Sequence, residues 1–373
     1  MKLAIVVSWL NQYGGAERVL EVLHEMYPSA PIFTSIYWPE ALPPEYRSWD
    51  IRVSALNKLP LIKRKHQWYL PFYPLAFEGF DLGEYDVVLS MPSAFAHGVV
   101  TPADTLHICY CLTPARFLWN YHTYVEREGI GRLPRAVLPT FMKSLRLWDR
   151  SAAQGVDHFV AISQVVRQRI AKYYRRDATV IYPPVNTDAF APADERGDYF
   201  LVVSRLVPYK RVDLAVRAFS KLGLPLYVVG GGRDAAALRA MAAPNVRFLG
   251  QVSDRELKGY VAGCRALIFP GAEDFGLTPL EAMAAGRPVI AYAKGGALET
   301  VVEGVTGEFF RDQSAESLAE AVSRFDERRY DGTALCQHAE QYSRRVFKQR
   351  LGDFVASKLS EGKNEPGKDS GAR

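Results

Sequence analysis

Short apolar runs alternate along the chain with segments whose apolar residues repeat at helical spacing. The first run, Leu3–Ser8, is followed by a glycine turn and by a helical pattern from Ala16 to Met26. A second run, Phe200–Ser204, is followed by a loop and by the amphipathic segment Val212–Leu222. Short apolar runs of this kind are typical of buried strands in parallel sheets. Each stretch is therefore expected to open a doubly wound sheet.

Both halves of the chain continue in the same way. Further short strands are predicted at Val87–Leu89, His107–Tyr110, Phe159–Ile162, Leu226–Val229, Val246–Phe248, Ala266–Phe269 and Val289–Tyr292. Helical segments lie between most of them, and strands that alternate with helices form parallel sheets through right-handed crossovers. The pattern therefore predicts an α/β fold with two Rossmann-like domains.

A double proline interrupts the pattern within Tyr182–Thr187. Because proline cannot continue a helix or a central strand, this segment is expected to be a hinge. The predicted organisation is a first domain at residues 1–185, a second at 186–342 and a C-terminal helix at 343–360. Residues 361–373 are rich in Gly, Lys and Glu without an apolar pattern, so they are expected to form a disordered tail.

Composition narrows the class of protein. With 373 residues the chain is long enough for two cores, and its 48% hydrophobic and 23% charged residues are those of a globular protein. The four scattered cysteines match neither a disulfide framework nor zinc spacing, which indicates reduced thiols in the cytoplasm. No apolar run is long enough to span a bilayer, so the protein is expected to be cytoplasmic or peripheral on the inner face of the membrane.

The formal charge of +5 permits an acidic partner such as a nucleotide or a lipid diphosphate and identifies none. So small a net charge, without a binding motif, argues against nucleic acid.

The strongest chemical signal is the segment Gly271–Gly286, which follows a predicted strand. Thr278 suits an N-cap and Pro279 the first helical position, so a helix is expected to begin here and to end near Gly286. Gly276 would let the backbone approach a ligand, and the free N–H groups of the first turn would bind an anion.

Two carboxylates, Glu273 and Glu281, flank this predicted anion site. The arrangement fits a nucleotide sugar, with the diphosphate on the helix terminus and the carboxylates on sugar hydroxyls and ribose. Thr278 and Glu281 also have the spacing of a capping box, so Glu281 has a purely structural alternative.

A second signal follows the first strand of the second domain, in Ser204–Lys210. This loop is expected at the carboxyl edge of the sheet, where ligands bind in such folds. There Arg205 and Lys210 can neutralise a diphosphate and stabilise the charge that develops as it leaves. The alternative is a pair of solvated loop cations.

The combination of Ser204-Arg205-Leu206, Lys210, Glu273 and Glu281 resembles the retaining glycosyltransferases of family 4, which have the GT-B fold. Other pieces are similar to elements of that family; they are Gly14-Gly15-Ala16-Glu17-Arg18, Ala161-Ile162-Ser163, Tyr182-Pro183-Pro184-Val185 and Val229-Gly230-Gly231-Gly232. The resemblance covers about residues 1–355. It implies an interdomain cleft, with the acceptor on the first domain and the donor on the second.

Within the family, His107-Ile108-Cys109-Tyr110-Cys111 and Phe117-Leu118-Trp119-Asn120 resemble most closely the mannosyltransferases of O-antigen and exopolysaccharide assembly. Those enzymes use GDP-mannose and act on lipid-linked acceptors. The resemblance therefore implies a GDP-mannose donor and a lipid-linked glycan acceptor, although the residues themselves do not distinguish GDP from UDP.

The resemblance also implies roles for individual residues. Arg205 and Lys210 would hold the diphosphate, Glu273 the transferred sugar and Glu281 the ribose. The remaining donor-site positions that it implies are Gly14, Gly15, Ser204, Gly230, Gly231, Asp274, Phe275, Gly276, Leu277 and Thr278. The acceptor side would include Tyr110, Leu112 and Thr113.

One position departs from the family. Where relatives have a histidine that contacts the transferred sugar, this chain has Leu112. The loss of one such contact costs on the order of 1–3 kcal/mol. The departure is compatible with altered selectivity, with slow turnover, or with a catalytically inactive subunit that binds a partner transferase. His97 and His107 lie nearby in sequence, and a lone histidine is more often structural.

Two other enzyme classes fit less well. The chain has no Asp-x-Asp metal clamp, so the reaction is expected to need neither metal nor cofactor, with the cations and the helix dipole supplying positive charge. The spacing of Gly230-Gly231-Gly232 is not that of a dinucleotide fingerprint, which argues against a dehydrogenase. A sugar-nucleotide epimerase would need further acid and base residues that the sequence does not identify.

The stretch Lys58–Tyr73 mixes cations with aromatic residues. It could meet anionic headgroups or the diphosphate of a lipid-linked acceptor. A solvated basic face beside buried aromatic residues explains the same pattern, and the sequence leaves both readings open.

Overall fold

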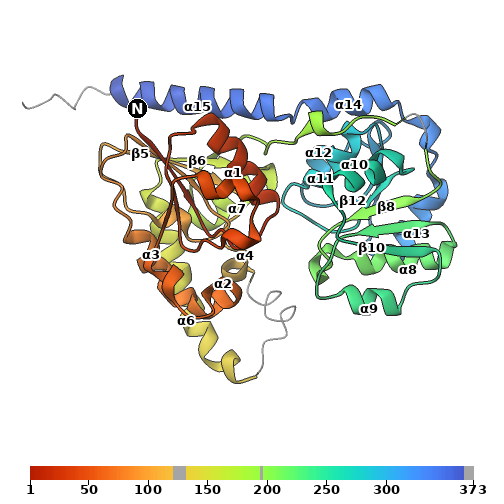
Figure 1. The fold of residues 1–373 in the computed structure, drawn as a ribbon, viewed down its shortest axis with the longest axis horizontal. Coiled ribbons are helices and arrows are strands. Elements are labelled where there is room, and N and C mark those ends of the chain that lie inside the picture. Colours follow the sequence, from red (N-terminus) through yellow and green to blue (C-terminus); the bar gives the residue numbers. More distant parts are fainter. Residues whose placement is uncertain (121–131, 194–195, 365–373) are drawn as a thin grey trace, which may run out of the picture. The chain divides into compact units, whose positions relative to one another are not determined.

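The computed structural model describes residues 1–120, 132–193 and 196–364, and the chain forms two compact units (Figure 1). The N-terminal unit contains Met1–Ile162, Val166–Tyr182 and the segment that begins at Phe347. The C-terminal unit contains Ser163–Val165 and Pro183–Val346. The main chain crossing thus falls between Tyr182 and Pro183, at the double proline.

The N-terminal unit is built on a seven-stranded parallel sheet with the order β3-β2-β1-β4-β5-β6-β7. Its strands are β1 (Leu3–Val7), β2 (Ile32–Thr34), β3 (Ile51–Val53), β4 (Val87–Met91), β5 (Leu106–Cys111), β6 (His158–Ala161) and β7 (Ala178–Val180). The chain runs outward from β1 to β3 and then returns to β4 on the other side of β1. This reversal makes the carboxyl ends of β1 and β4 the switch point of the sheet.

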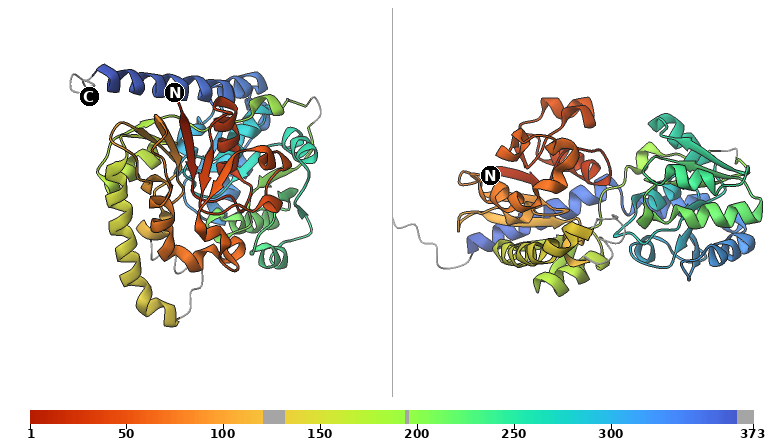
Figure 2. Two further views of the ribbon diagram at one scale, coloured as in Figure 1. Left: turned by 60° about the vertical axis from the view of Figure 1, so that its left-hand side comes forward. Right: turned by 90° about the horizontal axis from the view of Figure 1, so that it is seen from below.

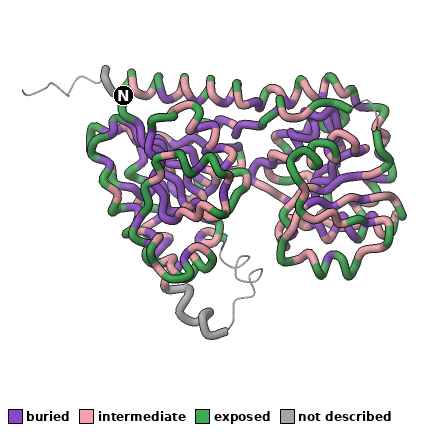
Figure 3. The backbone as a smooth tube through the Cα atoms, viewed as in Figure 1, coloured by how far each residue is buried: buried purple, intermediate pink, exposed green. Residues whose placement is uncertain are grey.

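Helices cover both faces of this sheet (Figure 2). They are α1 (Gly15–Met26), α2 (Ile62–Lys65), α3 (Tyr73–Glu78), α4 (Arg116–Trp119), α6 (Arg132–Ala152), α7 (Gln164–Tyr174) and α15 (Arg344–Asn364). In β1, Ala4 and Val6 join a core cluster with Phe77 of α3 and Met142 of α6, while the alternate residue Ile5 is equally buried. Burial on both faces explains the continuous apolar runs in the sequence, and Figure 3 shows the buried positions in the strands.

The last helix returns to the N-terminal unit. The ring of Phe347 packs edge-on against Tyr110 at 5.5 Å, and Lys348 pairs with Glu25 of α1 at 2.8 Å. Helix α15 continues to Asn364, so residues 361–364 are helical and the predicted start of a disordered tail at 361 was wrong. The rest of that predicted tail, residues 365–373, lies outside the described residues.

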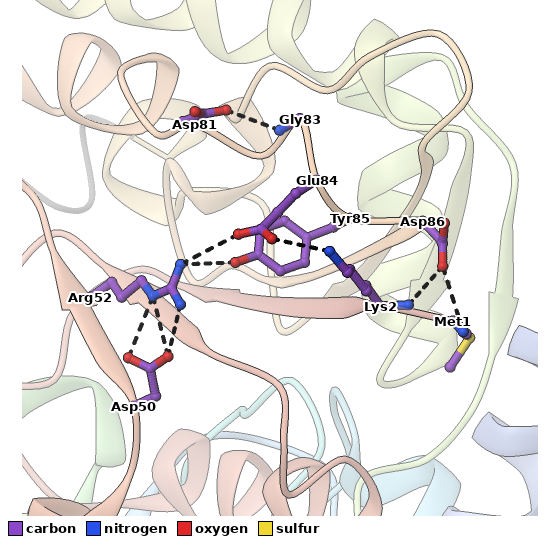
Figure 4. A network of polar contacts seen from close by, with 9 residues as sticks. All are labelled: Met1, Lys2, Asp50, Arg52, Asp81, Gly83, Glu84, Tyr85 and Asp86. Atoms are coloured by element: carbon purple, nitrogen blue, oxygen red, sulfur yellow. Dashed lines mark hydrogen bonds and ion pairs between the residues drawn. The ribbon is translucent and has the colours of Figure 1, made fainter.

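An exposed polar network joins the amino ends of three strands in this sheet (Figure 4). The backbone N–H of Lys2 donates to Asp86 at 2.7 Å, and Arg52 donates to the hydroxyl of Tyr85 at 2.9 Å while pairing with Asp50. Such surface pairs contribute about 0–1 kcal/mol each. They occupy the edge opposite to the one at which ligands bind in sheets of this type.

The C-terminal unit has a six-stranded parallel sheet with the order β10-β9-β8-β11-β12-β13. The strands are β8 (Phe200–Val203), β9 (Leu226–Val229), β10 (Val246–Gly250), β11 (Leu267–Phe269), β12 (Val289–Tyr292) and β13 (Gly307–Phe310). The helices are α8 (Val212–Leu222), α9 (Ala235–Ala240), α10 (Asp254–Gly263), α11 (Leu277–Ala284), α12 (Ala297–Thr300), α13 (Ala315–Arg324) and α14 (Gly332–Glu340). Here the switch point lies between β8 and β11. The predicted α/β fold with two Rossmann-like sheets is confirmed.

Candidate functional site

The switch point of the C-terminal sheet brings two predicted site residues together. Lys210 ends a short 3-10 turn (Pro208–Lys210) in the loop after β8, and Glu273 lies in the loop after β11. The Lys210 ammonium forms an ion pair with a carboxylate oxygen of Glu273. Their side chains are 15% and 19% exposed, so the pair is shielded from bulk water but still reachable by a ligand.

Arg205 belongs to the same loop and is connected to Lys210 through Tyr209. The Arg205 guanidinium donates to the Tyr209 hydroxyl at 2.7 Å. The Lys210 ammonium lies 5.5 Å from the centre of the Tyr209 ring, within the range of a cation–π contact. The loop after β8 therefore presents two cations that share one aromatic neighbour, at the carboxyl edge of the sheet, where ligands bind in folds of this type.

Helix α11 starts earlier than the sequence predicted. Its N-cap is Gly276 and its first helical residue is Leu277, so the predictions of Thr278 as N-cap and Pro279 as first helical residue were wrong. Gly276 has a φ of 94°, and a Cβ there would lie 2.8 Å from the ring of Phe269. Proline is tolerated at the third helical position because the first-turn N–H groups have no partner within the helix.

The earlier start of α11 changes which backbone N–H groups are free at its first turn, and it changes the place of Glu281 within the helix. The first-turn amides are those of Leu277 and Thr278, because Pro279 has no N–H. They form the positive end of the helix, next to the Glu273 loop. Because Thr278 is not the N-cap, the alternative capping box with Glu281 does not form; Glu281 is the fifth helical residue and is 6% exposed.

A pair of glycines that sequence reasoning missed positions the Glu273 loop. The Gly296 N–H donates to the Glu273 carbonyl at 2.8 Å. A Cβ on Gly296 would lie 2.2 Å from the carbonyl oxygen of Phe275, so only glycine allows this approach. The sequence did contain a signal for these glycines, because Gly295-Gly296 lies just after the predicted strand Val289–Tyr292.

The predicted glycine turn after β9 packs against the loop that carries the cations. The Leu206 N–H donates to the Gly231 carbonyl at 2.9 Å, and the Gly230 N–H donates to Gly250 at 2.7 Å. Ser204 is half-buried, and its hydroxyl donates to the carbonyl of Arg205 at 3.1 Å. The turn and the neighbouring strand end thus position the backbone from which Arg205 extends.

The predicted glycine loop of the N-terminal unit lies between the carboxyl end of β1 and helix α1. Gly14 is the N-cap of α1, with extended backbone at φ −172°, and Gly15 is the first helical residue. A Cβ on Gly14 would meet only Glu17, at 3.6 Å. The protein itself therefore leaves room for a side chain at Gly14.

The three predicted acceptor-side residues occupy different environments. Tyr110 is fully buried, and its hydroxyl donates to the carbonyl of Ile181 at 3.0 Å, so the structure gives it a role in the core. Leu112 is half-buried just beyond β5, with its N–H donated to Pro92 at 3.0 Å. Thr113 is 8% exposed and accepts a hydrogen bond from Arg169 at 3.0 Å. Only Leu112 and Thr113 lie beyond the carboxyl end of the strand.

The two histidines that lie near Leu112 in the sequence are structural. The ring of His97 lies 3.2 Å from the carbonyl oxygen of Asp149 and 3.5 Å from its carboxylate, and both side chains are buried. The Nε2 atom of His107 lies 2.8 Å from the hydroxyl of Ser90 in β4. Burial lowers the pKa of His107 to about 3 and raises the pKa of Asp149. Neither imidazole points to the surface beside Leu112.

Metal-binding clusters and membrane-spanning helices are both absent from the described part of the chain. No group of three or more His, Cys, Asp or Glu side chains there is arranged to hold a metal ion. No helix in the described ranges is both long and apolar enough to cross a bilayer.

Two family models match consecutive parts of the chain. Residues 13–189 match the model described as Glycosyltransferase Family 4, and residues 186–346 match the model described as Glycosyl transferases group 1. Together they cover residues 13–346.

Curated relatives carry mannosyltransferase names. A GDP-mannose-dependent alpha-(1-6)-phosphatidylinositol monomannoside mannosyltransferase of Mycobacterium tuberculosis is 33% identical over 57% of this chain, and the chain spans only 63% of that relative's length. The O-antigen chain mannosyltransferase RfbU of Salmonella typhimurium is 31% identical over 53% of this chain and 59% of its own length.

Solved structures agree on the fold. HepE of Anabaena, crystallised with UDP, superposes with a TM-score of 0.72 at 17% identity over 96% of this chain and 100% of its own. A sucrose-phosphate synthase of Thermosynechococcus elongatus gives a TM-score of 0.72 at 19% identity over 97% of this chain and 100% of its own. The family matches, the two parallel sheets and these structures agree: the chain belongs to glycosyltransferase family 4 and has the GT-B fold.

Proposed function

We propose that the chain is a retaining glycosyltransferase that moves mannose from GDP-mannose to a lipid-linked or polysaccharide acceptor. The process would be surface glycan synthesis, such as O-antigen assembly for lipopolysaccharide or exopolysaccharide synthesis. Family membership and the names of the curated relatives support this proposal. The observation that carries it is the Lys210–Glu273 pair in the loops beside the first turn of α11, at the switch point of the C-terminal sheet.

In the proposed reaction the C-terminal unit holds the donor. Lys210, Arg205 and the first-turn amides of α11 bind the diphosphate and stabilise the charge on it as the glycosidic bond breaks. Glu273 accepts hydrogen bonds from the sugar hydroxyls, and Glu281 binds the ribose. The positive charge of the two cations and the helix end takes the place of a metal ion.

The bond changes follow a front-face retaining route. The bond between the anomeric carbon and the diphosphate oxygen breaks, and a bond forms between that carbon and the acceptor oxygen on the same face. The acceptor proton passes to the leaving diphosphate, so no separate protein base is needed. The enzyme then acts by positioning and by charge stabilisation.

The acceptor would bind to the N-terminal unit, near Leu112 and Thr113 at the carboxyl edge of its sheet. A lipid-linked acceptor would bring the enzyme into peripheral contact with the inner face of the cytoplasmic membrane. This part of the proposal rests on the relatives' names, one of which includes a phosphatidylinositol lipid and another an O-antigen chain.

A thermal-shift series tests the donor assignment. GDP-mannose, GDP, UDP-glucose, UDP and ADP-glucose are compared at equal concentration, with mannose 1-phosphate as a control that lacks the diphosphate bridge and the base. Specific binding stabilises the fold by RT ln(1 + [L]/Kd), about 2.7 kcal/mol at 100 times Kd. We expect the largest shift with GDP-mannose. A larger thermal shift with a UDP-sugar would identify that sugar nucleotide as the donor in place of GDP-mannose. The absence of any shift would contradict the proposal.

Leu112 favours a second candidate function, a catalytically inactive subunit that binds a partner transferase. Such a subunit would bind the nucleotide tightly and would turn over neither donor nor acceptor. Donor hydrolysis and transfer assays of the wild type distinguish the two cases: tight nucleotide binding without turnover on any acceptor favours the inactive subunit. Leu112→His then tests why the position departs from the family. An increase in rate identifies Leu112 as a defect in a transferase, whereas an unchanged or lower rate in an active wild type indicates a pocket rebuilt around leucine.

A further inference from the structure

An exposed basic and aromatic surface covers consecutive helical turns of the N-terminal unit. The turns are α2, a 3-10 segment (His66–Phe72) and α3, which together run without a gap from residue 62 to 78. Of the thirteen large hydrophobic side chains that are exposed in the described ranges, four come from these turns and the residue before them. These are Leu61 (61%), Trp68 (64%), Phe72 (49%) and Leu75 (68%).

Exposed side chains recur along these turns. Leu61, Lys65, Trp68, Phe72 and Leu75 are exposed at intervals of three or four residues. Three other side chains of the same turns are buried: Ile62 is 2% exposed, and Tyr73 and Phe77 are fully buried in the core. These three side chains anchor the turns in the core, while the neighbouring apolar side chains stay in water.

The same surface is strongly cationic. Lys63, Arg64 and Lys65 lie between Leu61 and Trp68, and no Asp or Glu occurs from residue 51 to residue 77. The Lys65 ammonium lies 5.8 Å from the centre of the Trp68 ring, so cation and aromatic ring are neighbours in space. We define the basic–aromatic surface as Leu61, Lys63, Arg64, Lys65, Trp68, Phe72 and Leu75.

We propose that the basic–aromatic surface docks the protein onto a bilayer that contains anionic lipid. Trp, Phe and Leu would enter the boundary between headgroups and acyl chains, while the neighbouring cations meet the headgroup phosphates. A soluble acidic protein would match the charge, but it does not account for four large aliphatic and aromatic side chains exposed beside the cations. The inference rests on the proposed function in that a lipid-linked acceptor requires access to a membrane.

Vesicle flotation of the full-length protein tests the proposal. Vesicles of phosphatidylcholine alone are compared with vesicles that contain about one-third phosphatidylglycerol, the charged lipid that the surface would recognise. We expect binding to the anionic vesicles, weaker binding at high salt and little binding to the neutral ones. Equal binding to both, or binding to neither, would overturn the proposal.

Two variants localise the contact. Lys63→Gln/Arg64→Gln/Lys65→Gln is expected to reduce partitioning on the order of 100-fold, from about 1 kcal/mol per charge. Trp68→Ser/Phe72→Ser removes exposed apolar side chains and is expected to reduce it at least tenfold. Matched controls on the C-terminal unit are Lys221→Gln/Arg255→Gln/Lys258→Gln and Leu298→Ser/Val302→Ser, which also change exposed residues. If these variants bind anionic vesicles as well as the controls do, the basic–aromatic surface is not the membrane contact.

A further comparison separates this proposal from the proposed function. Nucleotide-dependent thermal stabilisation is measured on the same variants without lipid, and it should equal that of the wild type. Stabilisation by nucleotide without vesicle binding removes only the docking proposal. Vesicle binding without nucleotide stabilisation leaves docking intact and removes the transferase proposal. If the wild type binds heparin but not vesicles, and these variants lose heparin binding, the surface would instead bind an acidic partner.

A separate observation concerns Tyr209, which contacts both cations of the candidate site. Its hydroxyl accepts from Arg205 at 2.7 Å, and its ring faces the Lys210 ammonium at 5.5 Å. We infer that Tyr209 is a positioning residue that holds both cations toward the donor diphosphate, an inference that also rests on the proposed function. Arg205 is exposed, so without this contact its guanidinium would sample many rotamers.

A double-mutant cycle tests this role. Tyr209→Phe removes the hydroxyl but keeps the ring, and we expect about a tenfold loss of kcat/KM, mostly through a higher KM for the donor. In an Arg205→Ala background the same change should have no further effect, because the partner of the hydroxyl is gone. Equal losses in both backgrounds would overturn the inference. An unchanged rate in Lys210→Ala would instead overturn the proposed function.

Discussion

The two units have similar sheets and very different carboxyl edges. In the C-terminal unit, Lys210 and Glu273 form a partly exposed ion pair at the switch point, beside the free end of a helix. In the N-terminal unit, the titratable groups behind the corresponding edge, His97 and Asp149, are buried in the core. The C-terminal edge thus carries an ion pair beside a helix end, whereas at the N-terminal edge the Arg169 guanidinium donates to the Thr113 hydroxyl. This contrast favours donor chemistry on the C-terminal unit and acceptor recognition on the N-terminal one.

Lys210→Ala should cause the largest loss of activity among the variants that test this contrast. Loss of the ammonium removes stabilisation of the leaving diphosphate, and kcat/KM should fall about 100- to 1,000-fold. Steady-state kinetics with Lys221→Ala, an exposed lysine of α8, as the control would measure it. A rate within twofold of wild type would remove Lys210 from the site.

Glu273→Ala should reduce transfer by about 100-fold while free nucleotide binding changes little, because the carboxylate is assigned to the sugar and not to the phosphates. Transfer assays are paired with titration of the free nucleoside diphosphate. Glu273→Gln is the matched variant, since it keeps hydrogen-bonding capacity and loses the charge that pairs with Lys210. Parallel loss of transfer and nucleotide binding would show that Glu273 is misassigned.

Gly296→Ala should break the loop that supports Glu273. The added Cβ would meet the Phe275 carbonyl oxygen at 2.2 Å, so we expect a loss of about 1–3 kcal/mol in the free energy of unfolding. Gly259→Ala in α10 is the control, because nothing lies within 4 Å of its Cβ and alanine favours a helix by about 1 kcal/mol. Urea unfolding measures both, and equal stabilities would contradict the close approach.

The buried His107 predicts a pH dependence for the N-terminal unit. Its pKa in the folded protein is about 3, whereas an unfolded histidine has a pKa near 6.5, so between these values only the unfolded state binds the proton. Stability should therefore be complete above pH 6.5 and should fall below it by up to about 1.4 kcal/mol per pH unit. His107→Gln should flatten the slope in urea unfolding between pH 4 and 7, and an unchanged slope would contradict this origin.

The sequence was most informative where burial is continuous. The strand Val289–Tyr292 and the helix Val212–Leu222 have the bounds that were predicted, because both are bounded by clear changes in pattern. The strands β2, β3, β7 and β13 were missed, and three of them, β3, β7 and β13, are edge strands whose burial is not continuous. In β3, Arg52 and Val53 are exposed at the sheet edge, which removes the apolar signal as well.

The sequence identified the charged residues of the candidate site, but it did not identify the residues that position them. Lys210 and Glu273 were found from their places after strands, and the structure brings them together. The start of α11 was misplaced because the positive φ of Gly276 and the closeness of the Phe269 ring to it are features of the folded loop that the local sequence pattern does not show. Gly296 and Tyr209 were missed for the same reason: their roles arise from contacts with residues in the folded loops.

The most direct test of the account is a crystal structure of the protein with a bound nucleoside diphosphate. The account predicts that the diphosphate lies within hydrogen-bond distance of the Lys210 ammonium and of the amides of Leu277 and Thr278, with Arg205 turned toward it. A nucleotide bound at another edge of the C-terminal sheet, or only to the N-terminal unit, would contradict it.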